Sequence, residues 1–325
     1  MIHKAHIDDM IKDTQRVKTV RDPDNGNRYP AALWWSLLVI IIGMVAIGPN
    51  PAYSEEITDP ETQSSTKPLW ELGLFGGITR LPLYLGSSTH RTYALPLPYL
   101  IYRGKLFQSD REGVRGIFSR SEYLETTLSF FGNPPASEDG TAREGMGDLD
   151  PIIEAGPALK WYFLGRRPNQ YLYLQPALRW VTSVGLPDNV KFRYRGWRFL
   201  VNLIYQNDAV WGNDQWGMGW NLGINSANHQ YNGYFYDVAE EDVLPGRPAF
   251  EAEGGYGGMM LSGNVIYRLN RSVSFAAYGR WDGLAGAIYR DSPLVEQDNN
   301  FTVAAALIWT VATSKKQVDA RYQEK

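Results

Sequence analysis

The sequence predicts an all-β protein, a transmembrane antiparallel β-barrel of about 12 strands, within a range of about 10–12. Three observations predict this fold. The chain is rich in glycine and aromatic residues, with 32 Gly, 20 Tyr, 11 Trp and 12 Phe. Beyond residue 50, apolar and polar side chains alternate over short segments of about 9–11 residues, the length of a membrane-spanning strand. One apolar stretch near the start has the features of an export signal. Together they favour a barrel over a soluble sandwich with an aromatic core.

The overall composition excludes several classes of protein. The 32 Lys and Arg residues nearly balance the 35 Asp and Glu residues, so the basic excess of a nucleic-acid-binding protein is missing. The chain has no cysteine, which excludes disulfides and thiolate metal sites. Its mean hydropathy of −0.34 is compatible with a barrel, because only half of the wall faces lipid and the loops are polar.

The first 54 residues are predicted to be a signal peptide with a long polar beginning and an apolar core at 31–48. Ala52 and Ser54 supply the small residues that a signal peptidase needs, which places the cleavage before Glu55. A retained signal anchor is the alternative, because the apolar core reaches the length of a membrane span. The polar residues 55–68 are predicted to form a flexible lead into the barrel.

The barrel itself is predicted to occupy 69–312, followed by a polar tail at 313–325. Alternation and turn residues place twelve strands at 69–78, 91–103, 105–110, 114–120, 123–131, 152–164, 171–183, 191–206, 215–226, 255–269, 273–284 and 301–312. Long connections stand at 132–151, 227–254 and 285–300, and short ones at 165–170 and 269–272. Because bacterial barrels carry short turns on the periplasmic side, the long connections are expected outside the cell.

Two prolines in the second predicted strand raise a question about the wall. Pro96 and Pro98 lie two residues apart and oppose an apolar face formed by Tyr93, Leu95, Leu97, Tyr99 and Ile101. Proline lacks the N–H that a strand donates to its neighbour, and two such residues remove donors from the same edge. We therefore expect 81–98 to leave the regular wall, as a rim beyond the bilayer, a bulged or broken edge, or a segment folded into the lumen. A bulge that curves a small barrel is an equally simple explanation.

A series of short motifs resembles one known family. The motifs are WELG at 70–73 with Gly76-Gly77, LPxYxGS at 81–87, RxYxLPxPY at 91–99 with YRG at 102–104, DRxGVRG at 110–116, and GMxDLDP at 145–151 with ExGP at 154–157. Their order and spacing are similar to the MltA-interacting protein family, also called MipA/OmpV, over about 70–310. The long leader and the residues after Trp309 depart from the family pattern.

The resemblance implies a barrel in the Gram-negative outer membrane, in contact with the bilayer and lipopolysaccharide. It also implies a scaffold that recruits murein-remodelling enzymes, a lytic transglycosylase and a murein synthase, through the periplasmic face. Since other family members are described as adhesins or porin-like proteins, a narrow channel or a surface adhesin remains the alternative. The sequence leaves the oligomeric state open.

A few residues are candidates for binding. If the proline-rich segment lies at the periplasmic rim, Pro82, Pro96, Pro98 and Tyr99 would present a stiffened surface to a partner. Asp148 and Asp150 would bind a cation or a basic partner, or simply serve turn chemistry, which we favour. The basic residues predicted to line the lumen or bind lipid A phosphates are Arg103, Arg111 and Arg115.

Catalysis is not expected. After the predicted signal peptide the chain has only two histidines, His90 and His229, and His90 lies in a Gly/Ser turn without a marked acidic partner. Two histidines without cysteine do not suggest a zinc site. The prediction is a protein without enzyme activity, metal or cofactor.

Overall fold

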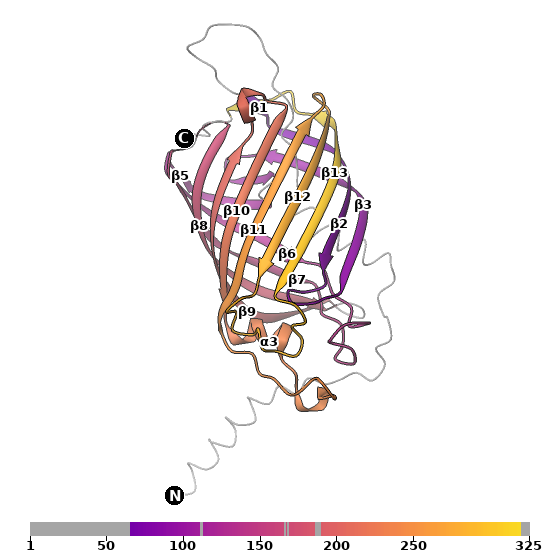
Figure 1. Cartoon of the computed structure of the whole chain (residues 1–325). Coiled ribbons are helices and arrows are strands. Elements are labelled where there is room, and N and C mark those ends of the chain that lie inside the picture. Colours follow the sequence, from indigo (N-terminus) through magenta and orange to yellow (C-terminus); the bar gives the residue numbers. More distant parts are fainter. Residues whose placement is uncertain (1–65, 111–112, 166, 168, 186–189, 320–325) are drawn as a thin grey trace, which may run out of the picture.

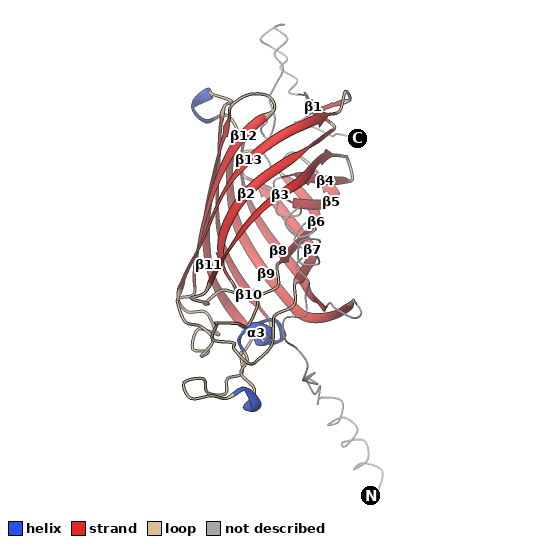
Figure 2. Cartoon of the chain, turned by 90° about the vertical axis from the view of Figure 1, so that its right-hand side faces the viewer, coloured by secondary structure: helices blue, strands red, loops and turns tan. Residues whose placement is uncertain are grey.

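The computed structural model describes residues 66–110, 113–165, 167, 169–185 and 190–319. Over these residues the chain forms a closed barrel of twelve strands and a separate two-stranded sheet (Figures 1 and 2). The barrel strands are β2 (Trp70–Pro82), β3 (His90–Arg103), β4 (Phe107–Asp110), β5 (Gly113–Arg120), β6 (Leu124–Asn133), β7 (Ile152–Tyr162), β8 (Gln170–Gly185), β9 (Lys191–Asn207), β10 (Trp216–Ala227), β11 (Gly255–Arg268), β12 (Val273–Gly283) and β13 (Asn299–Thr313). The predicted fold class and strand number are confirmed.

Every strand of the barrel pairs antiparallel with its neighbours in the chain, and β13 pairs with β2 to close the ring. The last strand illustrates why the sequence folds this way. Its alternate residues Phe301, Val303, Leu307 and Trp309 are exposed on the outside, where lipid covers them, while Ala306 and Ile308 are buried inside. The period of two therefore separates a lipid face from a lumen face.

The two ends of the barrel differ. One end carries the short connections together with the sheet of β1 (Thr66–Pro68) and β14 (Gln317–Asp319), which are paired with each other (Figure 1). The other end carries the long connections and α3 (His229–Tyr236) (Figure 2). β1 and β14 fall in segments for which the sequence showed no strand pattern, and each has only three residues.

The segment with the two prolines runs as a paired strand on one side. Residues His90 to Tyr102 of β3 pair without a bulge with Pro82 to Trp70 of β2, so 81–98 does not leave the wall as a whole. On its other side β3 pairs with β4 only at Tyr102 and Arg103. Among the described residues, none pairs with His90 to Tyr99 on that side. The strand is therefore an edge over most of its length.

The direction of the backbone groups explains the prolines. The N–H of Arg103 donates to the carbonyl of Leu69, at 2.8 Å, which places the odd-numbered donors of β3 on the β2 side. The even-numbered groups point the other way, and the Ser109 hydroxyl of β4 indeed donates to the carbonyl of Leu100, at 3.1 Å. Pro96 and Pro98 thus lack their N–H on the free edge, where no strand needs it.

Among the described residues, no helix is long and apolar enough to cross a membrane. The predicted signal peptide and most of the predicted lead lie outside the described residues, so the boundary at residue 54 stays a prediction.

Candidate functional site: the barrel lumen and its loop cap

The connections define which way the barrel faces. Barrels of this kind place short turns in the periplasm and long loops outside the cell. The short-turn end, which also holds β1 and β14, is therefore the periplasmic end. The long connections 134–151, 228–254 and 284–298, with the turn 83–89, lie at the external end, and we refer to them together as the loop cap.

A buried carboxylate on β7 pairs with two basic side chains inside the lumen, near the external end. Glu154 is fully buried and accepts a hydrogen bond from Nη1 of Arg198, at 2.7 Å, while Nη1 of Arg179 lies 3.5 Å from its other oxygen. The Arg198 guanidinium also lies over the ring of Tyr231, 5.0 Å from its centroid. Two arginines share one carboxylate, so this cluster has a net positive charge.

A second buried glutamate pairs with basic side chains nearer the periplasmic end. Glu125 of β6 accepts from Nε of Arg120 at 2.7 Å, with Nζ of Lys160 at 3.6 Å and Nε of Arg115 at 3.9 Å. A third ion pair joins Glu71 and Arg103. Charges inside the barrel thus lie in pairs and networks, which offsets the cost of removing them from water.

Apolar side chains line the opposite side of the lumen, on β3, β11, β12 and β13. Tyr99 packs with the buried residues of neighbouring strands, which are Ile101, Ile266, Ala276, Ala306 and Ile308. Its hydroxyl lies 2.6 Å from Oγ1 of Thr310. The inward side chains therefore contact one another on both sides of the lumen, as in a packed interior rather than a wide aqueous channel.

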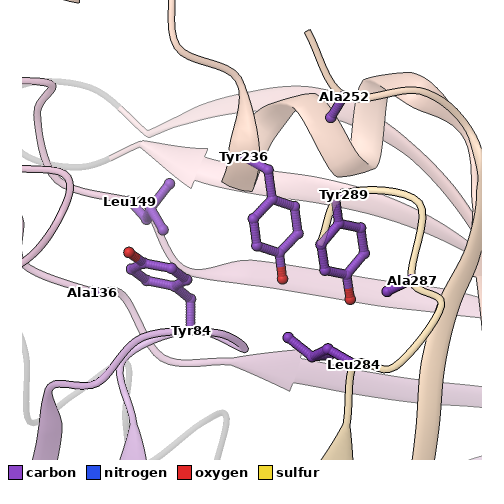
Figure 3. Close-up of a cluster of buried hydrophobic side chains, with 8 residues drawn as sticks. All are labelled: Tyr84, Ala136, Leu149, Tyr236, Ala252, Leu284, Ala287 and Tyr289. Carbon is purple, nitrogen blue, oxygen red and sulfur yellow. The ribbon is translucent and has the colours of Figure 1, made fainter. Parts of the chain in front are cut away.

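The loop cap has a hydrophobic core of its own at the external end (Figure 3). Tyr236, the last residue of α3, stacks on Tyr289 with ring centroids 3.8 Å apart and planes 7° apart. Its hydroxyl donates to the carbonyl of Leu85, at 2.9 Å, and that of Tyr289 donates to the carbonyl of Gly257, at 2.7 Å. The rest of this core comprises Tyr84, Ala136, Leu149, Ala252, Leu284 and Ala287.

Burial keeps the tyrosines of the cap uncharged. Desolvation raises the pKa of Tyr84 to about 12 and that of Tyr289 to about 12, and it raises the pKa of Tyr236 well above its ordinary value. Each hydroxyl is therefore protonated at neutral pH and donates its hydrogen bond. Burial also lowers the pKa of Arg143, whose Nη1 donates to the carbonyl of Phe235 at 2.7 Å.

The helix of the cap is fixed to the barrel wall by its N-terminal capping residue. Oδ1 of Asn228 accepts from the N–H of Tyr231, which caps α3, and from the N–H of Trp197 in β9 at 3.0 Å. Gly196 has φ +102°, and a Cβ there would overlap the Asn228 side chain. The bulge at Gly196 in β9 and the cap of α3 therefore depend on each other.

The candidate binding residues from the sequence do not meet in one place. Pro82 is at the external end of β2, while Pro96 and Pro98 face outward from the wall and Tyr99 faces the lumen. Asp148 accepts from the N–H of Glu138, at 2.9 Å, within the cap. The carbonyl of Asp150 accepts from the hydroxyl of Tyr234, at 3.1 Å. Pro96, Pro98 and Tyr99 lie within β3 and the other three at the external end, so a partner surface built from these residues at the periplasmic rim stays a prediction.

The basic residues predicted for the lumen or lipid A are placed in part. Arg103 pairs with Glu71, and Arg115 donates to Oε1 of Gln108 at 2.9 Å, both on the inner face. Arg111 lies outside the described residues. Sequence reasoning missed Glu71, Glu125 and the role of Glu154, although a lone glutamate at an inward position of an alternating strand was a usable signal. Over the described residues, no group of three or more His, Asp or Glu side chains is arranged to hold a metal ion.

The periplasmic end presents large apolar side chains to solvent. Trp211, in the short 3-10 helix Val210–Gly212 between β9 and β10, is 87 % exposed. Leu106, between β3 and β4, is 79 % exposed. Single exposed apolar residues are ordinary, but these two project from the end of a barrel whose other turns are short.

Comparison with known structures finds other barrels of outer membranes. A bacterial polysaccharide outer membrane secretin has 8 % identity and a TM-score of 0.37, covering 74 % of this chain and 99 % of its own. An outer membrane channel from Pseudomonas putida F1 has 10 % identity and a TM-score of 0.32, with 78 % and 100 % covered. The outer membrane protein OprD from Pseudomonas aeruginosa has 8 % identity and a TM-score of 0.30, with 85 % and 99 % covered. No curated protein sequence matches the chain.

The closed barrel, its lipid-facing exterior and its charged interior define an integral protein of the Gram-negative outer membrane. Residues 72–311 match the family model described as MltA-interacting protein MipA. The chain belongs to this family, which confirms the resemblance seen in the sequence.

Proposed function

We propose that this barrel is a scaffold of the outer membrane that holds a murein lytic transglycosylase at its periplasmic end, together with a murein synthase. The observation that carries the proposal is the close packing of inward side chains. Inward side chains such as Glu154, Lys160, Tyr173 and Ile266 are almost fully buried, and the folded loop cap covers the external end. A barrel packed in this way is better suited to binding a partner on its surface than to conducting solutes through its lumen.

The family description supplies the partner, because it names an interaction with MltA. A partner in the periplasm meets the short-turn end, where Trp211 and Leu106 are exposed. An exposed tryptophan is the type of side chain that anchors a protein interface, and the exposed leucine adds apolar surface for a partner to cover. The competing role for Trp211 is an aromatic at the membrane–water boundary, which would serve anchoring instead of binding.

The test is retention of purified MltA by the immobilised full chain in detergent. We expect retention by the natural chain and a several-fold loss in the double variant Trp211→Ala with Leu106→Ala. The matched control is Val243→Ala with Leu244→Ala, which removes exposed apolar side chains from the opposite end and leaves retention unchanged. No retention by the natural chain, or equal loss in both double variants, would contradict the proposal.

The second candidate is a narrow channel, and the charged lumen favours it. The cluster of Glu154, Arg179 and Arg198 resembles the charged rings that select ions in pores. Single-channel recording on the purified chain separates the two. The scaffold predicts little or no conductance, whereas steady conductance without retention of MltA favours the channel.

A further inference from the structure

The wall of the barrel has a window at membrane depth. β3 is paired with β2 along its whole length, but β4 and β5 are short and accompany it only near the periplasmic end (Figure 2). β4 has four residues and β5 has eight, against fourteen in β3. Between β3 and β6, the half of the wall nearer the external end therefore has no described strand.

The window is framed on all sides. The hairpin of β4 and β5 closes it toward the periplasm, and β6 forms the far side. The connection 134–151 crosses the external rim, since Oγ1 of Thr89 donates to the carbonyl of Gly140 at 3.0 Å. The opening is therefore a gap in the wall and not a loss of barrel closure.

At the level of Pro96 and Pro98, the side chains of β3 are apolar on both surfaces of the wall. On the outer surface Pro96, Pro98 and Leu100 are exposed, and they lie in register with Gly76, Leu74 and Leu72 of the lipid-facing band of β2. On the inner surface Leu97 packs against Phe75 and Tyr93. Across the gap, Phe131 of β6 faces inward, with the Arg179 guanidinium 5.3 Å from its ring centroid. The border of the window suits a hydrocarbon chain better than a polar ligand.

The prolines argue against a strand as the occupant. A free edge in a membrane normally invites another strand, including that of a second copy, because unpaired donors and acceptors are costly in lipid. Here Pro96 and Pro98 remove two neighbouring donors from that edge. An added strand would leave two of its own carbonyls without partners, at several kcal/mol each.

We propose that this window admits the acyl chain of a lipid from the outer leaflet. The chain lies between the β3 edge and β6, in contact with Pro96 and Pro98 outside and with Tyr93 and Phe131 inside. The polar end of the lipid remains at the external rim, near the net positive cluster of Glu154, Arg179 and Arg198. The window thus links the bilayer to the inner surface of the wall independently of the periplasmic end.

The experiment uses the full chain in vesicles of phosphatidylcholine that carries a photoactivatable diazirine halfway along one acyl chain. After irradiation, labelled residues are mapped by mass spectrometry. Tyr93 and Tyr278 form a matched pair, since both are half-buried and face inward. Tyr93 borders the window, whereas Tyr278 lies behind a wall paired on both sides, with Asn264 and Ala304.

We expect label on Tyr93 and Phe131, and several-fold less on Tyr278. A variant Phe131→Asn, which makes the inner border polar, is expected to lower the labelling of Tyr93, while Tyr278→Asn leaves it unchanged. Label confined to outward side chains, or equal label on Tyr93 and Tyr278, would overturn the proposal. Crosslinks between the β3 edges of two copies would overturn it in favour of a dimer.

Discussion

Pro98 in β3 lies directly opposite Leu74 in β2, with its ring nitrogen turned away from that strand. Pro96 lies opposite Gly76 in the same way. The β2–β3 ladder is therefore intact, and the missing donors fall only on the edge that faces the window. Proline in this arrangement protects an exposed edge from pairing with another chain.

Restoring the two N–H donors should allow this edge to pair with a strand of a second copy. We expect the double variant Pro96→Ala with Pro98→Ala to self-associate several-fold more strongly than the natural chain, because its free edge can then pair with that of a second copy. Size-exclusion chromatography with light scattering in detergent measures this. Pro176→Ala is the control, since β8 has a described neighbour on each side. Equal association of both variants would mean that the edge is covered.

Removing the buried carboxylate of β7 should destabilise the barrel. In Glu154→Gln the guanidinium groups of Arg179 and Arg198 lose their counter-charge inside the lumen, and breaking a buried pair costs about 3–5 kcal/mol. Urea unfolding in detergent measures the loss. The exposed pair of Arg290 and Asp298 provides the control, and Asp298→Asn should have little effect. A Glu154→Gln barrel as stable as the control would contradict the role of this cluster.

The stack of Tyr236 on Tyr289 should hold the loop cap closed. Tyr236→Phe keeps the ring and leaves the carbonyl of Leu85 without its donor, which costs about 1–3 kcal/mol. Tyr236→Ala also removes the stack, at about 3–5 kcal/mol. Protease cleavage within 134–151 and 228–254 should therefore increase in the order natural chain, phenylalanine variant, alanine variant. Cleavage that is the same in all three would show that the cap does not depend on this contact.

The cap should open in alkali. The buried tyrosines have pKa values raised above the ordinary 10.0, so their protonated form contributes stability that is present below pH 10 and is lost as the pH rises through about 12. We expect protection of the cap from a protease active in alkali to decline across this range. Tyr84→Phe and Tyr289→Phe together should flatten the decline. A cap that opens well below pH 10 would point to other groups.

The orientation of the barrel is open to direct labelling because the chain has no natural cysteine. A membrane-impermeant maleimide should label Leu244→Cys, an exposed position of the loop cap, in intact cells. Leu106→Cys, at the short-turn end, should be labelled only after the outer membrane is permeabilised. The opposite pattern would reverse the two ends and move the proposed docking surface to the outside.

Alternation and turn residues in the sequence predicted the positions of all twelve barrel strands. The segment 273–284, for example, corresponds to β12 at Val273–Gly283. Such segments are predictable because every other residue of a strand faces lipid and must be compatible with it. This alternation lies within each strand and does not depend on distant segments. β1 and β14 were not predicted, since three residues paired at a distance leave no period to detect. The helix α3 was missed because the sequence of His229–Tyr236 has no clear apolar face.

The sequence by itself determined the lipid-facing wall, the order of its strands and the family, because each depends on local alternation or on motifs in fixed order. It also showed that two donors were missing from one edge of the strand that holds Pro96 and Pro98. Only the tertiary structure decided that this edge faces a window, because the length of β4 and β5 beside β3 depends on register between distant segments. The pairing of Glu154 with Arg198 and the stack of Tyr236 on Tyr289 also required the closed barrel. Each joins residues from separate strands or loops, and no local pattern encodes their distance.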